Sequence, residues 1–319
     1  MTQARIAVFG VGGVGGYFGA MLARAGYPVA MIARGEQLRA IREHGLRVQT
    51  PQGEFTVRPS QATDTPAEVG PVDAVLIGTK AWQVPEAAAA VRPMVGPATK
   101  VVPLQNGVDA ADQLAQVLGW EHVTGGLCRV IASMAAPGVV RLGGMEPVVV
   151  LGELDGSELS GNARALYDAF RAAGVNVQVA SDIQAALWDK LLFIAGVSGT
   201  GAVARATIGE TRHCLPTRAL LQQIMEEVAA VADRRGVRLP ADAAARALAF
   251  IDNLPAEGTA SMQRDIADGK PSELEAINGA VVRFGQTLGV PTPANAFVYA
   301  ALLPQEIRAR AKTGSPAKR

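Results

Sequence analysis

The stretch RIAVFGVGGVGGYFGAMLARAGYPVAMIAR, residues 5–34, decides the fold. It opens on the short apolar run Arg5–Phe9, which ends at a glycine cluster. Val14–Ala25 then has the composition of a helix that stops at Gly26, and a second apolar run follows at Val29–Ala33. Strand, glycine turn, helix and strand within about 30 residues form the βαβ unit of a doubly wound sheet.

The glycine cluster matches the G-x-G-x-x-G pattern, and it stands where that pattern has meaning, after a strand and at the start of a helix. The first glycine permits the tight turn, the second lets the backbone approach a pyrophosphate, and the third lets the helix pack on the sheet. The alternative is a glycine-rich turn that binds nothing. The predicted cofactor-binding residues here are Gly10, Val11, Gly12, Gly13, Val14 and Gly15.

The end of the second strand distinguishes between the two nicotinamide cofactors. An NAD enzyme usually places an acidic residue there to hold the ribose hydroxyls, whereas this strand ends at Arg34. An arginine pairs with a 2′-phosphate, so NADP is favoured. The alternative is a solvated arginine, and Glu36 nearby keeps NAD open.

Polar residues follow two later strands, Val72–Ile77 and Lys100–Leu104. Lys80 comes after the first and is expected on the adenosine-phosphate side, and Asn106 comes after the second and is expected near the nicotinamide. Because ligands bind outside the carboxyl ends of parallel strands, these residues should converge with the glycine loop and Arg34. Asn106-Gly107 is equally well read as a favoured turn.

The pattern of predicted secondary structure changes near Ser181. Before it strands and helices alternate, including an expected hairpin at residues 47–58 and antiparallel strands at residues 123–152; after it almost every signal is helical. We therefore expect an NADP-binding Rossmann domain at 1–180, a helical substrate and catalytic domain at 181–312, a flexible tail at 313–319, and the site in the cleft between the domains. The expected helices of the second part are Asp182–Ile194, Pro216–Arg235, Ala241–Ile251, Glu273–Leu288 and Ala294–Lys312.

Composition excludes several functional classes. The chain has 319 residues with 30 Lys plus Arg against 29 Asp plus Glu, and a nucleic-acid binder would need a basic block that is missing. Two cysteines and three histidines do not make a disulfide scaffold and leave no predicted metal site. The apolar run Leu191–Ala204 is too short to span a bilayer, so a cytoplasmic protein without a membrane partner is expected.

At this point the sequence resembles the ketopantoate reductase (2-dehydropantoate 2-reductase) family over nearly its whole length. The motifs that carry the resemblance are GVGGVG at 10–15, IARGEQLRAIREHGL at 32–46, GTKAWQ at 78–83, PLQNGVD at 103–109, WDK at 188–190 and SMQRDIADGKPSELEAINGAVVRFGQTLGVPTPAN at 261–295. The resemblance implies a Rossmann domain joined to a helical domain like that of the 6-phosphogluconate dehydrogenase superfamily. It also implies reduction of a branched 2-keto acid by NADPH, in pantothenate and coenzyme A biosynthesis.

The resemblance places the general-acid lysine of the family on Lys190 and its glutamate on Glu273. It places a substrate serine on Ser261 and the strand-end asparagine on Asn106. These residues also have simpler interpretations. A lysine often extends from an amphipathic helix to water, and Ser261 fits a loop hydroxyl. Ser272-Glu273-Leu274-Glu275 fits a capping box, which accounts fully for Glu275 and in part for Glu273.

One departure concerns the substrate. The family usually has asparagines four and eight residues after the lysine, where this chain has Ile194 and Ser198. The expected activity is NADPH-dependent reduction of 2-dehydropantoate to pantoate. The alternatives are a reductase or dehydrogenase of the same fold for another 2-keto or 2-hydroxy acid, such as a mandelate-type substrate, and a non-catalytic NADP-binding regulator. A homodimer through the helical domain is also expected.

Overall fold

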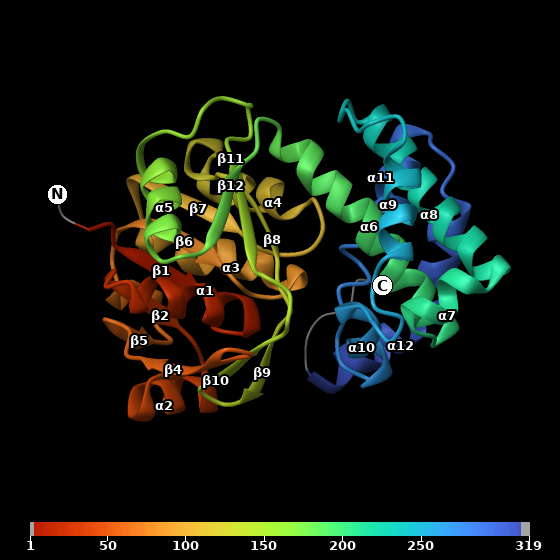
Figure 1. The fold of residues 1–319 in the computed structure, drawn as a ribbon. Coiled ribbons are helices and arrows are strands. Elements are labelled where there is room, and N and C mark those ends of the chain that lie inside the picture. The colour runs from red at the N-terminus through yellow and green to blue at the C-terminus, as the bar shows by residue number, and fades with distance from the viewer. Residues whose placement is uncertain (1–2, 314–319) are drawn as a thin grey trace. The chain divides into compact units, whose positions relative to one another are not determined.

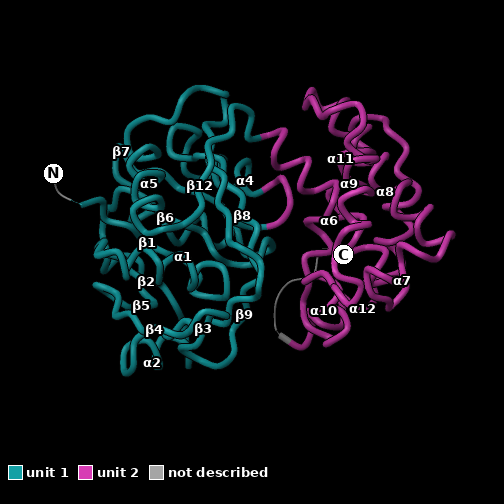
Figure 2. The backbone as a smooth tube through the Cα atoms, viewed as in Figure 1, with its two compact units in different colours: residues 1–105, 110–183 teal, residues 106–109, 184–319 magenta. Residues whose placement is uncertain are grey.

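The computed structural model describes residues 3–313, so residues 314–319 of the expected tail lie outside the described part. The chain divides into two compact units. Unit 1 comprises residues 1–105 and 110–183, and unit 2 comprises residues 106–109 and 184–319 (Figure 2). The chain therefore enters unit 2 twice, first for only four residues, Asn106–Asp109, and then for its helical second half.

Unit 1 is built on a five-stranded sheet in the order β5-β2-β1-β6-β7, in which every neighbouring pair is parallel. Its strands are β1 (Ile6–Phe9), β2 (Val29–Ile32), β5 (Gln61–Thr63), β6 (Val72–Ile77) and β7 (Val95–Pro103). The helices of this unit are α1 (Gly13–Arg24), α2 (Gly35–His44), α3 (Val84–Val91), α4 (Ala110–Leu118) and α5 (Gly161–Ala172), as Figure 1 labels them. The predicted doubly wound α/β fold is confirmed.

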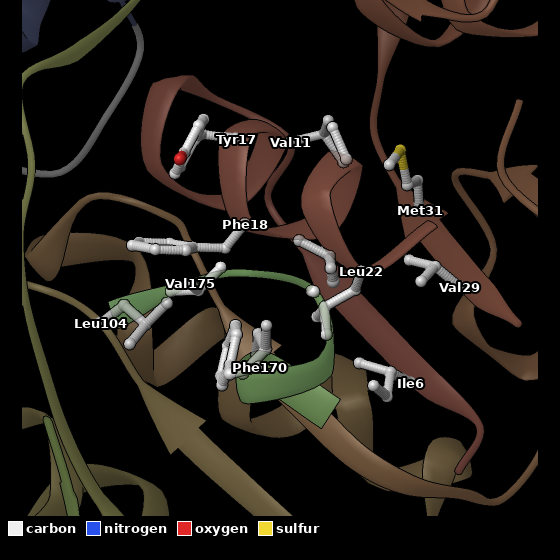
Figure 3. Packing of buried hydrophobic residues seen from close by; sticks show 14 of the residues in the cluster. Ile6, Val11, Tyr17, Phe18, Leu22, Val29, Met31, Leu104, Phe170 and Val175 are labelled. Atoms are coloured by element: carbon white, nitrogen blue, oxygen red, sulfur yellow. The ribbon is translucent and has the colours of Figure 1, made fainter. Parts of the chain in front are cut away.

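The sheet is buried on both faces, which explains why its strands are continuous apolar runs rather than alternating ones. Ile6 and Val8 of β1 belong to one core, whereas Ala7 and Phe9 belong to a second core. Helices α1 and α5 contribute to the first core, where the ring of Phe18 meets that of Phe170 edge-on at 5.8 Å (Figure 3). Helices α3 and α4 contribute to the second core.

Two smaller sheets complete unit 1. One has the order β4-β3-β10-β9, and its pair β3 (Leu46–Thr50) and β4 (Gly53–Val57) is the predicted antiparallel hairpin. The other has the order β12-β11-β8. The predicted strands in residues 123–152 are β8 (Gly125–Arg129), β9 (Ala132–Ala136), β10 (Val139–Leu142) and β11 (Val148–Gly152), and β12 (Asn176–Val179) follows them. They are antiparallel in part, because β10 pairs parallel to β3 and β11 parallel to β12.

Unit 2 is helical in its described residues apart from connecting turns. Its helices are α6 (Ile183–Ala204, whose first residue lies in unit 1), α7 (Ile208–His213), α8 (Leu215–Arg234), α9 (Ala243–Asp252), α10 (Ser261–Ala267), α11 (Asn278–Leu288) and α12 (Pro293–Thr313). Within residues 3–313 no helix combines the length and apolar composition needed to cross a bilayer.

Helix α6 runs ten residues beyond the predicted end at Ile194, through glycines that normally disfavour a helix. Close packing explains their presence. A Cβ on Gly196 would lie 2.6 Å from Met225 of α8, and one on Gly199 would lie 3.0 Å from both Asn278 of α11 and Val298 of α12. The glycines let three helices approach α6, so tertiary packing outweighs the local preference.

The predicted helix at Glu273 starts later, because α11 begins only at Asn278. Residues 273–277 form a turn, and the expected capping box is absent. The Ser272 hydroxyl instead donates to the buried Glu306 carboxylate at 2.6 Å and accepts the Leu274 N–H at 3.3 Å. A buried partner 34 positions away therefore replaces the local cap.

Candidate active site

The glycine loop joins β1 to α1 with the geometry that its sequence pattern requires. Gly10 has a φ of +94°, and a Cβ there would lie 2.6 Å from Thr79 Cγ2. Gly12, by contrast, has nothing nearer than the Gly78 carbonyl oxygen at 4.0 Å, so the space beside it is open. A Cβ on Gly15 would collide with the Gly10 carbonyl oxygen, so this third glycine lets α1 pack against the loop.

These observations fit a dinucleotide. A pyrophosphate needs open space beside the second glycine and the unpaired N–H groups of a helix N-terminus, and α1 begins at Gly13. The Thr79 hydroxyl beside Gly10 is buried with no hydrogen-bond partner among the described residues, as expected of a polar group left for a ligand.

Gln37 of α2 braces the loop, which the sequence did not predict. Its Nε2 donates to the Val11 carbonyl at 2.9 Å, and its Oε1 accepts the Gly138 N–H at 2.7 Å. Gly138 lies between β9 and β10, and the start of β9 also lies against the loop, since a Cβ on Gly13 would be 2.5 Å from the Ala132 carbonyl oxygen. One amide side chain thus connects the glycine loop to a second sheet.

Arg34 follows β2 and forms the N-cap of α2. Its side chain is 65% exposed, and its Nη2 donates to Glu86 Oε1 at 3.0 Å near the start of α3. A Cβ on the adjacent Gly35 would meet no atom within 4 Å apart from its chain neighbours and its own helix backbone. The guanidinium is therefore accessible, but a carboxylate already competes for it.

The carboxyl ends of β6 and β7 are joined by Gln105, whose Nε2 donates to the carbonyls of Ile77 at 2.8 Å and Thr79 at 3.0 Å. Lys80, three residues after β6, is half-buried and lies 6.0 Å from the centroid of the Trp82 ring. Because β2, β1, β6 and β7 are parallel neighbours, the loops that carry the glycine cluster, Arg34 and Lys80 leave the same edge of the sheet.

Asn106 belongs to unit 2 and meets another predicted site residue there. Its Nδ2 donates to Glu273 Oε2 at 2.8 Å. Glu273 is only 5% exposed, and such a buried carboxylate is stable only with polar partners. Gly107 has a φ of +100°, a conformation that favours glycine, and the chain bends at residues 106–108.

Helix α6 carries three of the predicted residues at helical spacing. Lys190, Ile194 and Ser198 lie at i, i+4 and i+8, which places them on one stripe of the helix. Lys190 and Ile194 are half-buried and Ser198 is buried. The neighbouring Trp188 is fully buried against Phe284 of α11, so the lysine lies on an anchored segment.

Ser261 is exposed and is the first residue of α10, a helix that the sequence patterns do not predict. Its contacts within the described residues do not connect it to the Asn106–Glu273 pair. Among residues 3–313, no cluster of three or more His, Cys, Asp or Glu side chains is arranged to hold a metal ion.

Comparison with known proteins places these features in a family. Residues 6–156 match the model of the family described as "Ketopantoate reductase PanE/ApbA", and residues 182–306 match that of its C-terminal domain. The chain is similar to a 2-dehydropantoate 2-reductase of Mesorhizobium japonicum, at 30% identity over 91% of this chain and 94% of that protein.

Solved structures agree. The chain resembles a PanE/ApbA family ketopantoate reductase from Ralstonia eutropha, with a TM-score of 0.87 and 34% identity over 96% of this chain and 99% of that one. It also resembles a D-mandelate dehydrogenase solved with NADH and anilino(oxo)acetate, with a TM-score of 0.86 and 25% identity over 96% and 99% of the two chains. With two family models matching along most of its length, this chain belongs to the ketopantoate reductase family of NAD(P)-dependent oxidoreductases.

Proposed function

We propose that this protein reduces 2-dehydropantoate to pantoate with NADPH, in pantothenate and coenzyme A biosynthesis. The observation that carries the proposal is the hydrogen bond between Asn106, three residues beyond β7, and the buried Glu273. It brings together two residues of motifs that are far apart in the sequence, PLQNGVD and PSELEAING. Family membership supplies the reaction type, and the site residues supply the roles below.

The cofactor site is assigned to unit 1. The glycine loop Gly10–Gly15 and the N-terminus of α1 would hold the pyrophosphate, Arg34 would pair with the 2′-phosphate, and Lys80 would lie on the adenosine-phosphate side. Bound NADPH supplies the hydride. The Arg34 guanidinium, which follows the second strand, supports NADP over NAD, although Glu86 must release it first.

Lys190 is the proposed general acid. Reduction of a ketone leaves negative charge on the carbonyl oxygen, and an ammonium beside that oxygen both stabilises the charge and donates the proton. Asn106 would orient the nicotinamide and the substrate. Glu273, already fixed by Asn106, would hold a substrate hydroxyl, and Ser261 would bind the carboxylate end.

A second candidate is reduction of a 2-keto acid without the pantoate-type hydroxyl, or oxidation of the matching 2-hydroxy acid. Ile194 and Ser198 favour it, because an isoleucine cannot hydrogen-bond a substrate hydroxyl. The likeness to a D-mandelate dehydrogenase with NADH supports the same alternative, for the substrate and for the cofactor.

The decisive experiment measures oxidation of NADPH and NADH with a panel of 2-keto acids that includes 2-dehydropantoate and phenylglyoxylate. The highest kcat/KM is expected with 2-dehydropantoate and NADPH. A preference for phenylglyoxylate and NADH would replace the proposal by the second candidate. Tight NADPH binding without turnover of any member of the panel would instead indicate a non-catalytic NADP-binding regulator.

A further inference from the structure

The four-residue segment Asn106–Asp109 is fastened to unit 2 at three positions. Asn106 donates to Glu273, as described above. Gly107 lies so close to the turn after Glu273 that a Cβ would be 2.7 Å from the Ala276 carbonyl oxygen. Asp109 then accepts a hydrogen bond from Arg283 of α11, whose Nη2 lies 2.6 Å from Asp109 Oδ2.

Arg283 also binds Glu275, in the turn that follows Glu273. Its Nη1 donates to the Glu275 carbonyl oxygen at 3.0 Å and to the Glu275 carboxylate. The guanidinium therefore bridges Asp109, three residues after Asn106, to Glu275, two residues after Glu273. The other carboxylate oxygen of Glu275 accepts the Tyr299 hydroxyl of α12 at 2.6 Å.

The Arg283 guanidinium is well suited to hold Asp109 and Glu275 in a fixed geometry. A guanidinium presents donors in a rigid planar fork, which an ammonium cannot imitate. Asp109 and Glu275 are 18% and 28% exposed, so their charges are only partly screened by water. Without Arg283, two carboxylates would face each other across the contact, and like charges at short range repel. The segment that carries Asn106 would then move away from the turn that carries Glu273.

We propose that Arg283 is a positioning residue, which holds the Asn106 amide against the Glu273 carboxylate by bridging Asp109 to Glu275. The inference rests on the proposed function, in which those two side chains orient the reactants. Arg283 acts on the reactants only through Asn106 and Glu273 in this proposal, so its effect should appear in turnover. A displacement of about 1 Å in a reacting group can cost roughly 100-fold in rate.

The kinetic test compares Arg283→Met and Asp109→Asn with a matched control, Arg218→Met. Arg218 pairs with Asp252 at 2.6 Å in the same unit, and the two arginines are exposed to a similar degree, but this pair does not contact the Asn106 segment. For Arg283→Met, kcat with the best 2-keto acid should fall about 10- to 100-fold. The Kd for NADPH should stay within about twofold of wild type, and Arg218→Met should leave all of these constants within about twofold.

Two further variants separate positioning from simple loss of fold. Arg283→Lys should recover only part of kcat, because one ammonium cannot fork to two carboxylates. The double variant Arg283→Met/Asp109→Asn should lose no more than Arg283→Met alone, since both changes break the same bridge. If Arg283→Met does not fold, Asp109→Asn and Arg283→Lys still decide the matter.

An NMR measurement on the Asn106 side-chain amide needs no substrate, so its outcome does not depend on the proposed function. In the ¹⁵N-labelled protein, the side-chain amide signals of Asn106 are identified by their loss in Asn106→Asp. Arg283→Met should move them in the direction that Glu273→Ala does, and Arg218→Met should not. Unmoved Asn106 signals, or a kcat in both Arg283→Met and Asp109→Asn equal to that of the control, would overturn the inference. A wild type that turns over no 2-keto acid would refute the proposed function, while the amide signals would still test the bridge.

Discussion

Asn106 and Glu273 lie 167 positions apart in the sequence, and their side chains meet in a single hydrogen bond of 2.8 Å. The bond joins a residue three positions beyond β7 to a buried carboxylate, and both residues belong to unit 2. It requires that residues 106–109 pack with unit 2, although the chain on both sides of them belongs to unit 1. The Asn106 side chain therefore lies beside Glu273, which we assign to substrate binding.

The first prediction concerns cofactor preference. Because Arg34 is the proposed 2′-phosphate ligand, NADPH should bind tighter than NADH, by about 10- to 100-fold for one charge-assisted contact. Arg34→Ala should remove this difference. Glu86→Gln should increase affinity for NADPH by a few-fold and leave NADH unchanged, because it frees the guanidinium from an exposed pair of small energy. Titration of cofactor fluorescence measures both, and equal wild-type affinities would contradict the assignment.

The second prediction concerns the brace on the glycine loop. Gln37→Leu removes the hydrogen bonds to Val11 and Gly138, so the loop is less well ordered before the cofactor binds. Affinities for NADPH and NADH should both fall by roughly tenfold, since one or two hydrogen bonds of this kind are lost. The control is Gln49→Leu on β3, whose amide accepts only the more distant Arg141 at 3.4 Å. If only NADPH binding weakens, Gln37 acts on the 2′-phosphate and not on the loop.

The third prediction concerns substrate choice. Ile194 is half-buried, one helical turn beyond Lys190, and offers no hydrogen bond. An unhydroxylated branched 2-keto acid should therefore compete well with 2-dehydropantoate in the wild type. Ile194→Asn should shift the ratio of the two kcat/KM values toward 2-dehydropantoate, by about tenfold for one hydrogen bond. Ile194→Val serves as the control for altered volume, and an unchanged ratio would mean that position 194 does not face the substrate.

The fourth prediction concerns alkaline stability. Burial, with the hydrogen bond to the Glu275 carboxylate and its charge, raises the pKa of Tyr299 to about 12. An unfolded tyrosine titrates near pH ~10, so above that pH the folded chain binds more protons than the unfolded chain, and stability falls as pH rises. Between these two pKa values the urea midpoint of the wild type should fall more steeply than that of Tyr299→Phe. Tyr27→Phe is the control, and parallel slopes for wild type and Tyr299→Phe would contradict the prediction.

Much of the fold was predictable because its signals are local. The βαβ unit at residues 5–34 combines apolar runs, glycines and a helix stop within one segment, and each element forms within two residues of the predicted bounds. The hairpin at residues 47–58 also depends on a local turn. The glycine loop and Arg34 follow from the same segment.

The rest depends on partners that are distant in sequence. Ser272-Glu273-Leu274-Glu275 has the pattern of a helix cap, but Glu306 accepts a hydrogen bond from Ser272 from 34 positions away, and the helix starts later. Arg283 has the pattern of an ordinary helix surface, and its hydrogen bond to Asp109 forms only because residues 106–109 pack with unit 2. A glycine-rich α6 is stable only because other helices fill the space that its glycines leave.

The last prediction concerns proton transfer. Lys190 is half-buried on α6, close to the buried Trp188, and it is the proposed proton donor to the oxygen of the reduced ketone. A positioned general acid contributes about 10²- to 10⁴-fold, so Lys190→Ala should lower kcat by that factor. NADPH should bind normally, because the glycine loop lies in unit 1 and Lys190 in unit 2.

Lys190→Arg should restore part of the charge stabilisation but not proton donation, because a guanidinium stays protonated near neutral pH. The pH profile of kcat separates the two roles, since Lys190→Arg should lose the limb that depends on the lysine. The matched control is Lys312→Ala, an exposed lysine in the last turn of α12, which should leave kcat and NADPH affinity unchanged. A Lys190→Ala enzyme within a few-fold of wild type would refute the assignment.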